Sequence, residues 1–277
     1  MERSAATAPG PAPSRAFAVG IGRAFGGALL FGLPLLMTME MWALGLAMDR
    51  LRLCILLLSA LPLLVGLSYY GGFEETPSLR EDVRDALIAI LVGTASSVVL
   101  LALFGALGPG RTPSEIVAMV ALQAAPASVG ALLARSQLGG GEREKKDPPY
   151  FGELFLMAVG ALFLSLNIAP TEETVLIAAK MTPVRGILLA LLSLAVMHAF
   201  VYVVEFHGQH ARPKGHGFAA VFLRFTLVGY ALALLMSVYM LWLFGRLDGT
   251  APTEAALIAV VLGFPAAMGA ASARLIL

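Results

Sequence analysis

Residues 22–40 read GRAFGGALLFGLPLLMTME, a long apolar run that contains Pro34 and ends on the acid Glu40. A helix that crosses the hydrocarbon core of a bilayer needs about 20 mostly apolar residues, because lipid offers its backbone no hydrogen-bonding partner. This run is long enough, but its proline removes a backbone donor. The stretch therefore predicts a membrane-spanning helix that is interrupted near Pro34.

The composition of the whole chain agrees with a membrane protein. Of 277 residues, 58% are hydrophobic and 13% are charged, whereas about a quarter of a soluble domain is charged. The net charge of +1 gives no excess positive field for nucleic acid. The single cysteine, Cys54, excludes an intrachain disulfide and a thiolate metal site. We expect the lipid bilayer as the main partner, no nucleic acid, no metal centre and no cofactor.

Eight stretches meet the requirements of a span, so the sequence predicts an all-α polytopic membrane protein with eight transmembrane helices. They lie near residues 25–48, 51–70, 86–107, 116–133, 154–179, 187–206, 218–244 and 255–275. The first and fifth stretches are longer than one crossing requires, and they contain Pro34 and Pro170. We expect both to be broken rather than straight.

Polar segments divide the chain into four parts. Residues 1–15, rich in Ala and Pro, predict a disordered tail, and the charged run 139–149 predicts a cytoplasmic linker. Between them lie two four-helix units, residues 16–138 and 150–277. Of the 19 Lys and Arg residues, 13 fall on the side of the N-terminus and six on the other. This asymmetry predicts that both termini lie in the cytoplasm. We expect the protein to be a multi-pass protein of the cell inner membrane.

The two units repeat one another. An offset of 133 residues places Thr38 on Thr171 and Glu40 on Glu173, and offsets of 139 and 140 align the later helices. A unit with four crossings begins and ends on the same side, so both copies have the same orientation. Transporters with such parallel repeats place their substrate sites between the halves, near mid-membrane.

The repeated Thr-x-Glu motif provides the candidate site. A carboxylate within the membrane is costly, so Glu40 and Glu173 predict an ion or proton site. A helix break at Pro170 would expose backbone carbonyls nearby. Additional oxygen donors follow from the same two segments: Thr38, Thr171, Asn167 and Glu172. The alternative is that these acids only charge the first turn of a helix, where the macrodipole favours them.

A second group of polar side chains lies in the sixth predicted span. His198, Tyr202 and Glu205 share one helix face and could form a proton relay from the cytoplasm. The alternative is a buried, hydrogen-bonded histidine, since Val65 occupies the corresponding place in the first unit.

Other motifs favour structural roles. The segment Thr112-Pro113-Ser114-Glu115 predicts a capping box at the start of a helix. In the second unit Ala251 stands in the place of Thr112, so the cap hydroxyl is absent there. Gly130 and Gly269 predict close helix packing. Arg52 either extends to the membrane interface or pairs with Glu40 or Glu173.

Residues 22–40, together with Asn-Ile-Ala-Pro-Thr-Glu-Glu at 167–173, resemble a bacterial family of integral membrane proteins of unknown function. The resemblance spans nearly the whole chain after the tail and implies the membrane class without an activity. A weaker likeness is to the organellar and bacterial potassium channels, whose first helix carries Arg and then Phe-Ser-Asp. Arg23 and Phe25 fit that pattern, but Gly26 and Gly27 replace the Ser-Asp pair.

These observations lead to one functional hypothesis and two alternatives. The chain is expected to be a non-enzymatic transporter that moves a cation or a proton-coupled solute through a site between the repeats. The alternatives are a cation channel, and a non-transporting membrane scaffold or sensor. Walker, HExxH and GxSxG motifs are absent, so we expect no catalytic residues. The sequence leaves a homo-oligomer open.

Overall fold

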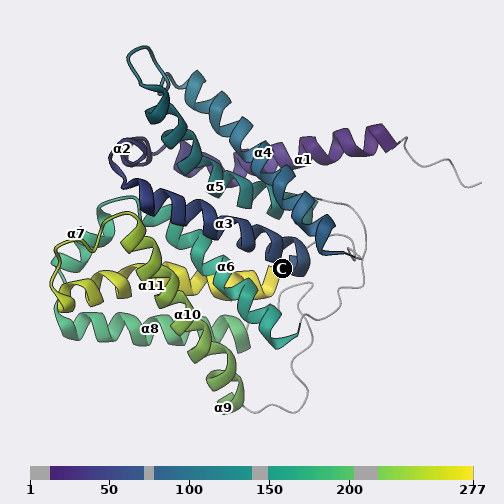
Figure 1. Cartoon of the computed structure of the whole chain (residues 1–277). Helices are drawn as coiled ribbons and strands as arrows, with labels where there is room; N and C mark the ends of the chain where they lie inside the picture. The colour runs from purple at the N-terminus through teal and green to yellow at the C-terminus, as the bar shows by residue number, and fades with distance from the viewer. Residues whose placement is uncertain (1–12, 72–77, 139–148, 203–217, 277) are drawn as a thin grey trace, which may run out of the picture.

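The computed structural model describes residues 13–71, 78–138, 149–202 and 218–276 (Figure 1). Every regular element in these ranges is helical. The elements of the first half are α1 (Pro13–Leu36), α2 (Met39–Ala47), α3 (Arg50–Gly71), α4 (Leu79–Leu103) and α5 (Pro113–Leu138). Those of the second half are α6 (Tyr150–Ile168), α7 (Glu173–Ala179), α8 (Pro183–Tyr202), α9 (Phe218–Val221), the π-helical η1 (Phe222–Leu227), α10 (Val228–Leu243) and α11 (Pro252–Ile276).

The prediction of eight transmembrane helices is confirmed. In the described part of the chain, eight helices are long and apolar enough to cross a membrane. These candidate spans are Ala18–Leu36, Arg50–Tyr70, Leu79–Leu103, Pro113–Leu133, Tyr150–Ile168, Pro183–Phe200, Phe222–Leu243 and Pro252–Ala273. The third ends earlier than expected, because Gly105 takes a positive φ of 74° just after α4.

The start of the first predicted unit differs from expectation, whereas its end at residue 138 coincides with the end of α5. Helix α1 begins at Pro13, so it already includes the last residues of the segment expected to be a tail. Proline is well suited to the first turn of a helix, where its missing N–H would have no partner. Residues 1–12 and the predicted linker at 139–148 lie outside the described residues.

The first and fifth predicted stretches are broken, as expected from their prolines. In the first half, α1 ends at Leu36 and α2 starts at Met39. In the second half, α6 ends at Ile168 and α7 starts at Glu173. We call residues 37–38 the first break and residues 169–172 the second break. Figure 1 shows α2 and α7 on the same side of the molecule, opposite the start of α1 and the end of α11.

One helix forms the centre of each half. Helix α5 packs against α1, α2, α3 and α4, and helix α11 packs against α6, α7, α8 and α10. The partners of α11 therefore follow the same order along the chain as the partners of α5. The apolar stretches with many Ala residues in α5 and α11 leave little side-chain bulk, which lets four neighbours surround each helix.

Close helix contacts use glycine in both halves, as the sequence predicted. A Cβ placed on Gly130 of α5 would lie 2.7 Å from the carbonyl oxygen of Gly27 in α1. The corresponding crossing of α6 and α11 brings Gly160 against Gly269, with their backbones in direct contact. Small residues allow this approach, and close van der Waals packing is a main source of helix association in lipid.

The two halves meet mainly through α3, which packs against α6 and α10, and α6 also contacts α5 and the Phe31 ring of α1. The ring of Phe155 lies over Gly66, and the hydroxyls of Ser59 and Tyr239 are 2.6 Å apart. At one end of this contact, both terminal nitrogens of Arg52 donate to the Asp248 carboxylate at 2.8 Å. Arg52 therefore pairs with neither Glu40 nor Glu173. That alternative is wrong, because the α10–α11 loop carries a nearer acid to this guanidinium.

Candidate functional site

The first break leaves backbone carbonyls at the end of α1 that the helix itself cannot satisfy. The Thr38 hydroxyl donates to the Pro34 carbonyl at 2.5 Å, and the indole N–H of Trp42 donates to the Leu36 carbonyl at 2.8 Å. Glu40 follows in the first turn of α2, where its side chain is exposed. The break is therefore a set of carbonyl and hydroxyl oxygens beside one carboxylate.

The second break also carries a threonine that is followed two residues later by an acid. The Thr171 hydroxyl donates to the Ile168 carbonyl at 2.8 Å, and the Asn167 amide donates to the Phe163 carbonyl at 2.8 Å. Glu172 and Glu173 are exposed at the start of α7. The Thr171 hydroxyl beside Glu173 holds the pKa of that carboxyl below its usual value, so Glu173 is ionised at neutral pH.

Arg246 distinguishes the second break from the first. This side chain comes from the α10–α11 loop, is mostly buried, and donates to the Pro170 carbonyl. One of its terminal nitrogens lies 3.6 Å from a Glu172 oxygen. The residue 140 positions before Arg246, which is its counterpart in the first half, is Ala106. The second break is thus contacted directly by a guanidinium from the α10–α11 loop, whereas beside the first break the arginine of the α4–α5 loop, Arg111, lines a neighbouring pocket.

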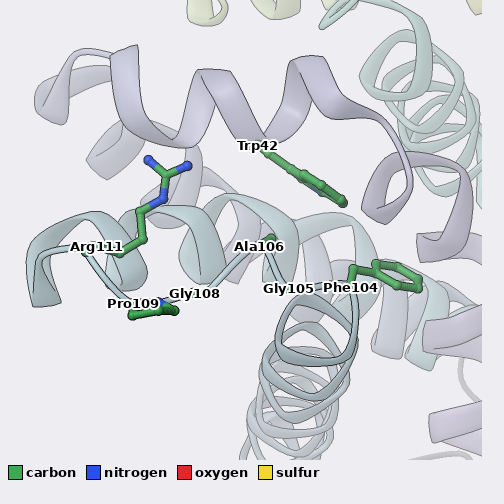
Figure 2. A pocket seen from close by; sticks show the side chains of 8 residues that line it. Trp42, Phe104, Gly105, Ala106, Gly108, Pro109 and Arg111 are labelled. Atoms are coloured by element: carbon green, nitrogen blue, oxygen red, sulfur yellow. The ribbon is translucent and has the colours of Figure 1, made fainter.

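The surroundings of Ala106 are open. A pocket of about 450 Å³ lies there, between α2 and the α4–α5 loop. Its lining includes Trp42, Phe104, Ala106 and Arg111, with the remainder contributed by Gly105, Gly108, Pro109 and Gly110. Figure 2 shows the Trp42 indole over the loop, with Phe104 at one end and the Arg111 side chain at the other. The Trp42 and Phe104 rings stack with centroids 6.3 Å apart.

Two further polar residues at the breaks were not predicted from the sequence. Gln123 of α5 is 1% exposed, and its amide nitrogen lies 3.4 Å from the Leu35 carbonyl, while its Oε1 has no partner among the described residues. Thr174 of α7 is 2% exposed, and its hydroxyl also has no hydrogen-bond partner there. A buried polar atom without a partner costs about 1–3 kcal/mol. Such atoms are where a bound ion or water supplies the missing interaction.

The predicted site residues are brought together within each break. Thr38 and Glu40 flank the first break, and Asn167, Thr171, Glu172 and Glu173 surround the second. One apolar cluster borders both breaks, since it includes Leu35 and Ala169. Across the described residues, no hydrogen bond or ion pair joins Glu40 to Glu173. The arrangement therefore consists of two oxygen-rich breaks over a shared core.

His198 is buried, and its Nδ1 lies 2.8 Å from the Thr226 hydroxyl. Thr226 belongs to η1, and the Phe222 ring of the same segment meets the imidazole edge to face. The structure therefore shows a hydrogen-bonded core histidine at a π-helical segment, a feature that is frequent at functional sites. The Tyr202 side chain and Glu205 lie outside the described residues, so the relay stays a prediction.

The capping box at the start of α5 is confirmed. The Thr112 N–H donates to Glu115 at 2.7 Å, and the Glu115 N–H donates to the Thr112 hydroxyl at 3.3 Å. Both bonds satisfy donors that the helix leaves open. Glu115 therefore has a structural role, and it is distinct from the acids at the breaks.

Comparison with known proteins gives the family. The family described as "Putative integral membrane protein (DUF2391)" matches residues 20–277. The chain belongs to this family. No curated protein and no solved structure matches the chain. Membership agrees with the eight apolar helices, so this DUF2391 protein is a multi-pass integral membrane protein.

Proposed function

We propose that this protein is a carrier that moves a cation or a proton-coupled solute, with its site at the two helix breaks. The observation that carries the proposal is that each break lies beside a buried polar atom that has no hydrogen-bond partner in the described part of the chain, Gln123 Oε1 in the first half and Thr174 Oγ1 in the second. Each break also presents a threonine and an acid two residues later, Thr38 with Glu40 and Thr171 with Glu173.

The chemistry of these groups favours a cation. Carbonyl, amide and carboxylate oxygens are the ligands that hard cations prefer. At the second break, the Arg246 guanidinium already lies against the Pro170 carbonyl and near Glu172, so this break accepts a positive charge. The first break has Ala106 in the corresponding place and is next to a pocket. A mobile cation would therefore bind at the first break, with Glu40 and Gln123 as its closest candidates for ligands.

The proposal includes the internal duplication. Corresponding glycine crossings, corresponding breaks and the matching neighbours of α5 and α11 support it. It also includes a location in the bacterial inner membrane, and an orientation with both termini in the cytoplasm, which the distribution of Lys and Arg supports. We further propose that the protein performs no enzymatic reaction.

The test is flux in proteoliposomes that contain the purified protein. Glu40→Gln, Glu173→Gln and the double variant should lower Na⁺-, K⁺- or H⁺-driven flux, because each substitution removes a carboxylate charge. Glu40→Gln should have the larger effect if the first break binds the mobile ion. Glu81→Gln is the matched control, since Glu81 is an exposed acid in the first turn of α4. Unchanged flux in the double variant would reject the site.

Two further readouts separate the alternatives. A carrier saturates with substrate concentration, whereas single-channel conductance in a planar bilayer would indicate a channel. An ion that binds only the folded state raises its stability by mass action. Ion-dependent thermal stabilisation that is lost in Glu40→Gln therefore supports the carrier. Its absence for Na⁺, K⁺ and H⁺ alike would favour a scaffold or sensor.

A further inference from the structure

The contact between the two halves is not symmetric. Helix α3 of the first half packs against α6 and α10 of the second half. On the duplication proposed above, the counterparts of these helices are α8, α1 and α4. Among the described residues, no comparable packing joins α8 to α1 or α4. Figure 1 shows α8 along one edge of the molecule, and α1 and α4 along the opposite edge.

The residues that correspond to the covered surface of α3 are exposed on α8. Ile55 and Ser59 of α3 are partly buried, and Ser59 contacts Tyr239 of α10. At the offset of 133, their counterparts on α8 are Leu188 and Leu192, which are 59% and 50% exposed. Helix α8 therefore presents an apolar surface whose counterpart on α3 is covered by protein.

The opposite edge shows the matching feature. Phe155 of α6 lies against Gly66, and Val159, one turn later, belongs to the apolar cluster that joins α6 to α3. Their counterparts on α1 are Gly22 and Gly26, which are exposed and have no atom within 4 Å of a Cβ placed on them. Glycine within a helix costs about 1 kcal/mol relative to alanine. Glycines spaced four apart typically mark the place where a second helix approaches a membrane helix.

We propose that a second copy of this chain covers these surfaces, with α8 of each copy packed against α1 and α4 of the other. The occupant is inferred from the chain itself, because the counterpart of each surface already has a protein partner in the contact between the halves. Such a head-to-tail contact either closes into a ring or continues indefinitely. Two chains supply four halves, so a closed dimer uses every such surface and leaves no open edge.

Cysteine cross-linking in native membranes tests this dimer. The contact of Gly66 with Phe155 corresponds to a contact of Ala199 in one copy with Gly22 in the other. In a Cys54→Ser background, the double variant Gly22→Cys/Ala199→Cys should give a cross-linked dimer with a short bismaleimide. Gly66→Cys/Phe155→Cys is the positive control for an intrachain link. With a protease site placed in 139–148, this link should hold the two cleaved halves together.

Two controls make the result decisive. The first control is Leu87→Cys/Ala199→Cys. Leu87 is an exposed residue of α4, and its counterpart in the second half, Leu227, is exposed as well and so lies outside the contact between the halves. This pair should give little cross-linked dimer. Gly22→Leu should abolish the dimer on native mass spectrometry while the monomer stays folded, because no atom of the described residues lies within 4 Å of a Cβ placed there. A failed Gly22–Ala199 link alongside a successful intrachain link would overturn the proposal, as would equal cross-linking by the Leu87 pair. Neither result depends on flux, so the dimer and the ion site can fail separately.

Discussion

Substituting alanine for Gly130 probes the close crossing of α1 and α5 in the first half. The added Cβ would lie 2.7 Å from the Gly27 carbonyl oxygen and equally close to Cβ of Phe31. Since 3.4 Å is an ordinary contact, α1 and α5 must separate by roughly 0.7 Å, and neither obstacle is a flexible side-chain end. Overpacking of this kind costs about 1–3 kcal/mol, and the better helix propensity of alanine returns up to about 1 kcal/mol. We expect a net loss of about 1–2 kcal/mol in the free energy of unfolding.

The measurement is reversible unfolding by sodium dodecyl sulfate in mixed micelles, followed by tryptophan fluorescence. Gly20→Ala on α1 is the control, because no atom lies within 4 Å of the new Cβ and only the gain in helix propensity remains. Gly269→Ala should lose at least as much stability as Gly130→Ala, since its crossing with Gly160 is tighter. The reasoning is refuted if Gly130→Ala is as stable as the wild type, or if Gly20→Ala loses as much as Gly130→Ala.

Three other predictions follow from single contacts. The Arg52 guanidinium lowers the pKa of the Asp248 carboxyl. The ion pair therefore stabilises the fold fully above about pH 4, and this stabilisation is lost as the pH falls through the lowered pKa of Asp248. Asp248→Asn should remove this acid dependence from the unfolding curves. Thr112→Ala should cost about 1 kcal/mol in the same unfolding assay, and Ala251→Thr should raise stability by completing the second capping box. Gln123→Leu should raise the free energy of unfolding by about 1 kcal/mol, because it removes a buried oxygen that has no partner among the described residues. The same variant should lower the ion flux in proteoliposomes. A destabilised variant with full flux would contradict both expectations.

The spans and breaks were predictable because their signals are local. Hydropathy and length depend only on neighbouring residues, and Pro34 and Pro170 disrupt the helix within one turn of where they occur. The capping box at Thr112 is equally local, since its two hydrogen bonds connect residues three apart. These features follow from chain chemistry before any tertiary contact forms.

Contacts between distant residues could not be predicted in the same way. Arg52 and Asp248 are 196 positions apart, and the loop that joins α10 to α11 decides their meeting. The π-helical segment η1 contains neither glycine nor proline, and its Thr226 meets His198 from another helix. Gln123 did carry a sequence signal, namely an amide within an apolar span whose counterpart is Leu262. Its significance depends on the Leu35 carbonyl, which only the fold brings near.

On the duplication and the carrier function proposed above, the presence of Arg246 at one break and of Ala106 in the corresponding place at the other has an evolutionary consequence. An ancestor built from identical single units would have carried the same residue at both positions, so a mutation to arginine would have filled every break at once. Fusion of two units into one gene removes that restriction. One copy can then keep a fixed charge that ties two loops together, while the other stays free to exchange its occupant with the surrounding solution.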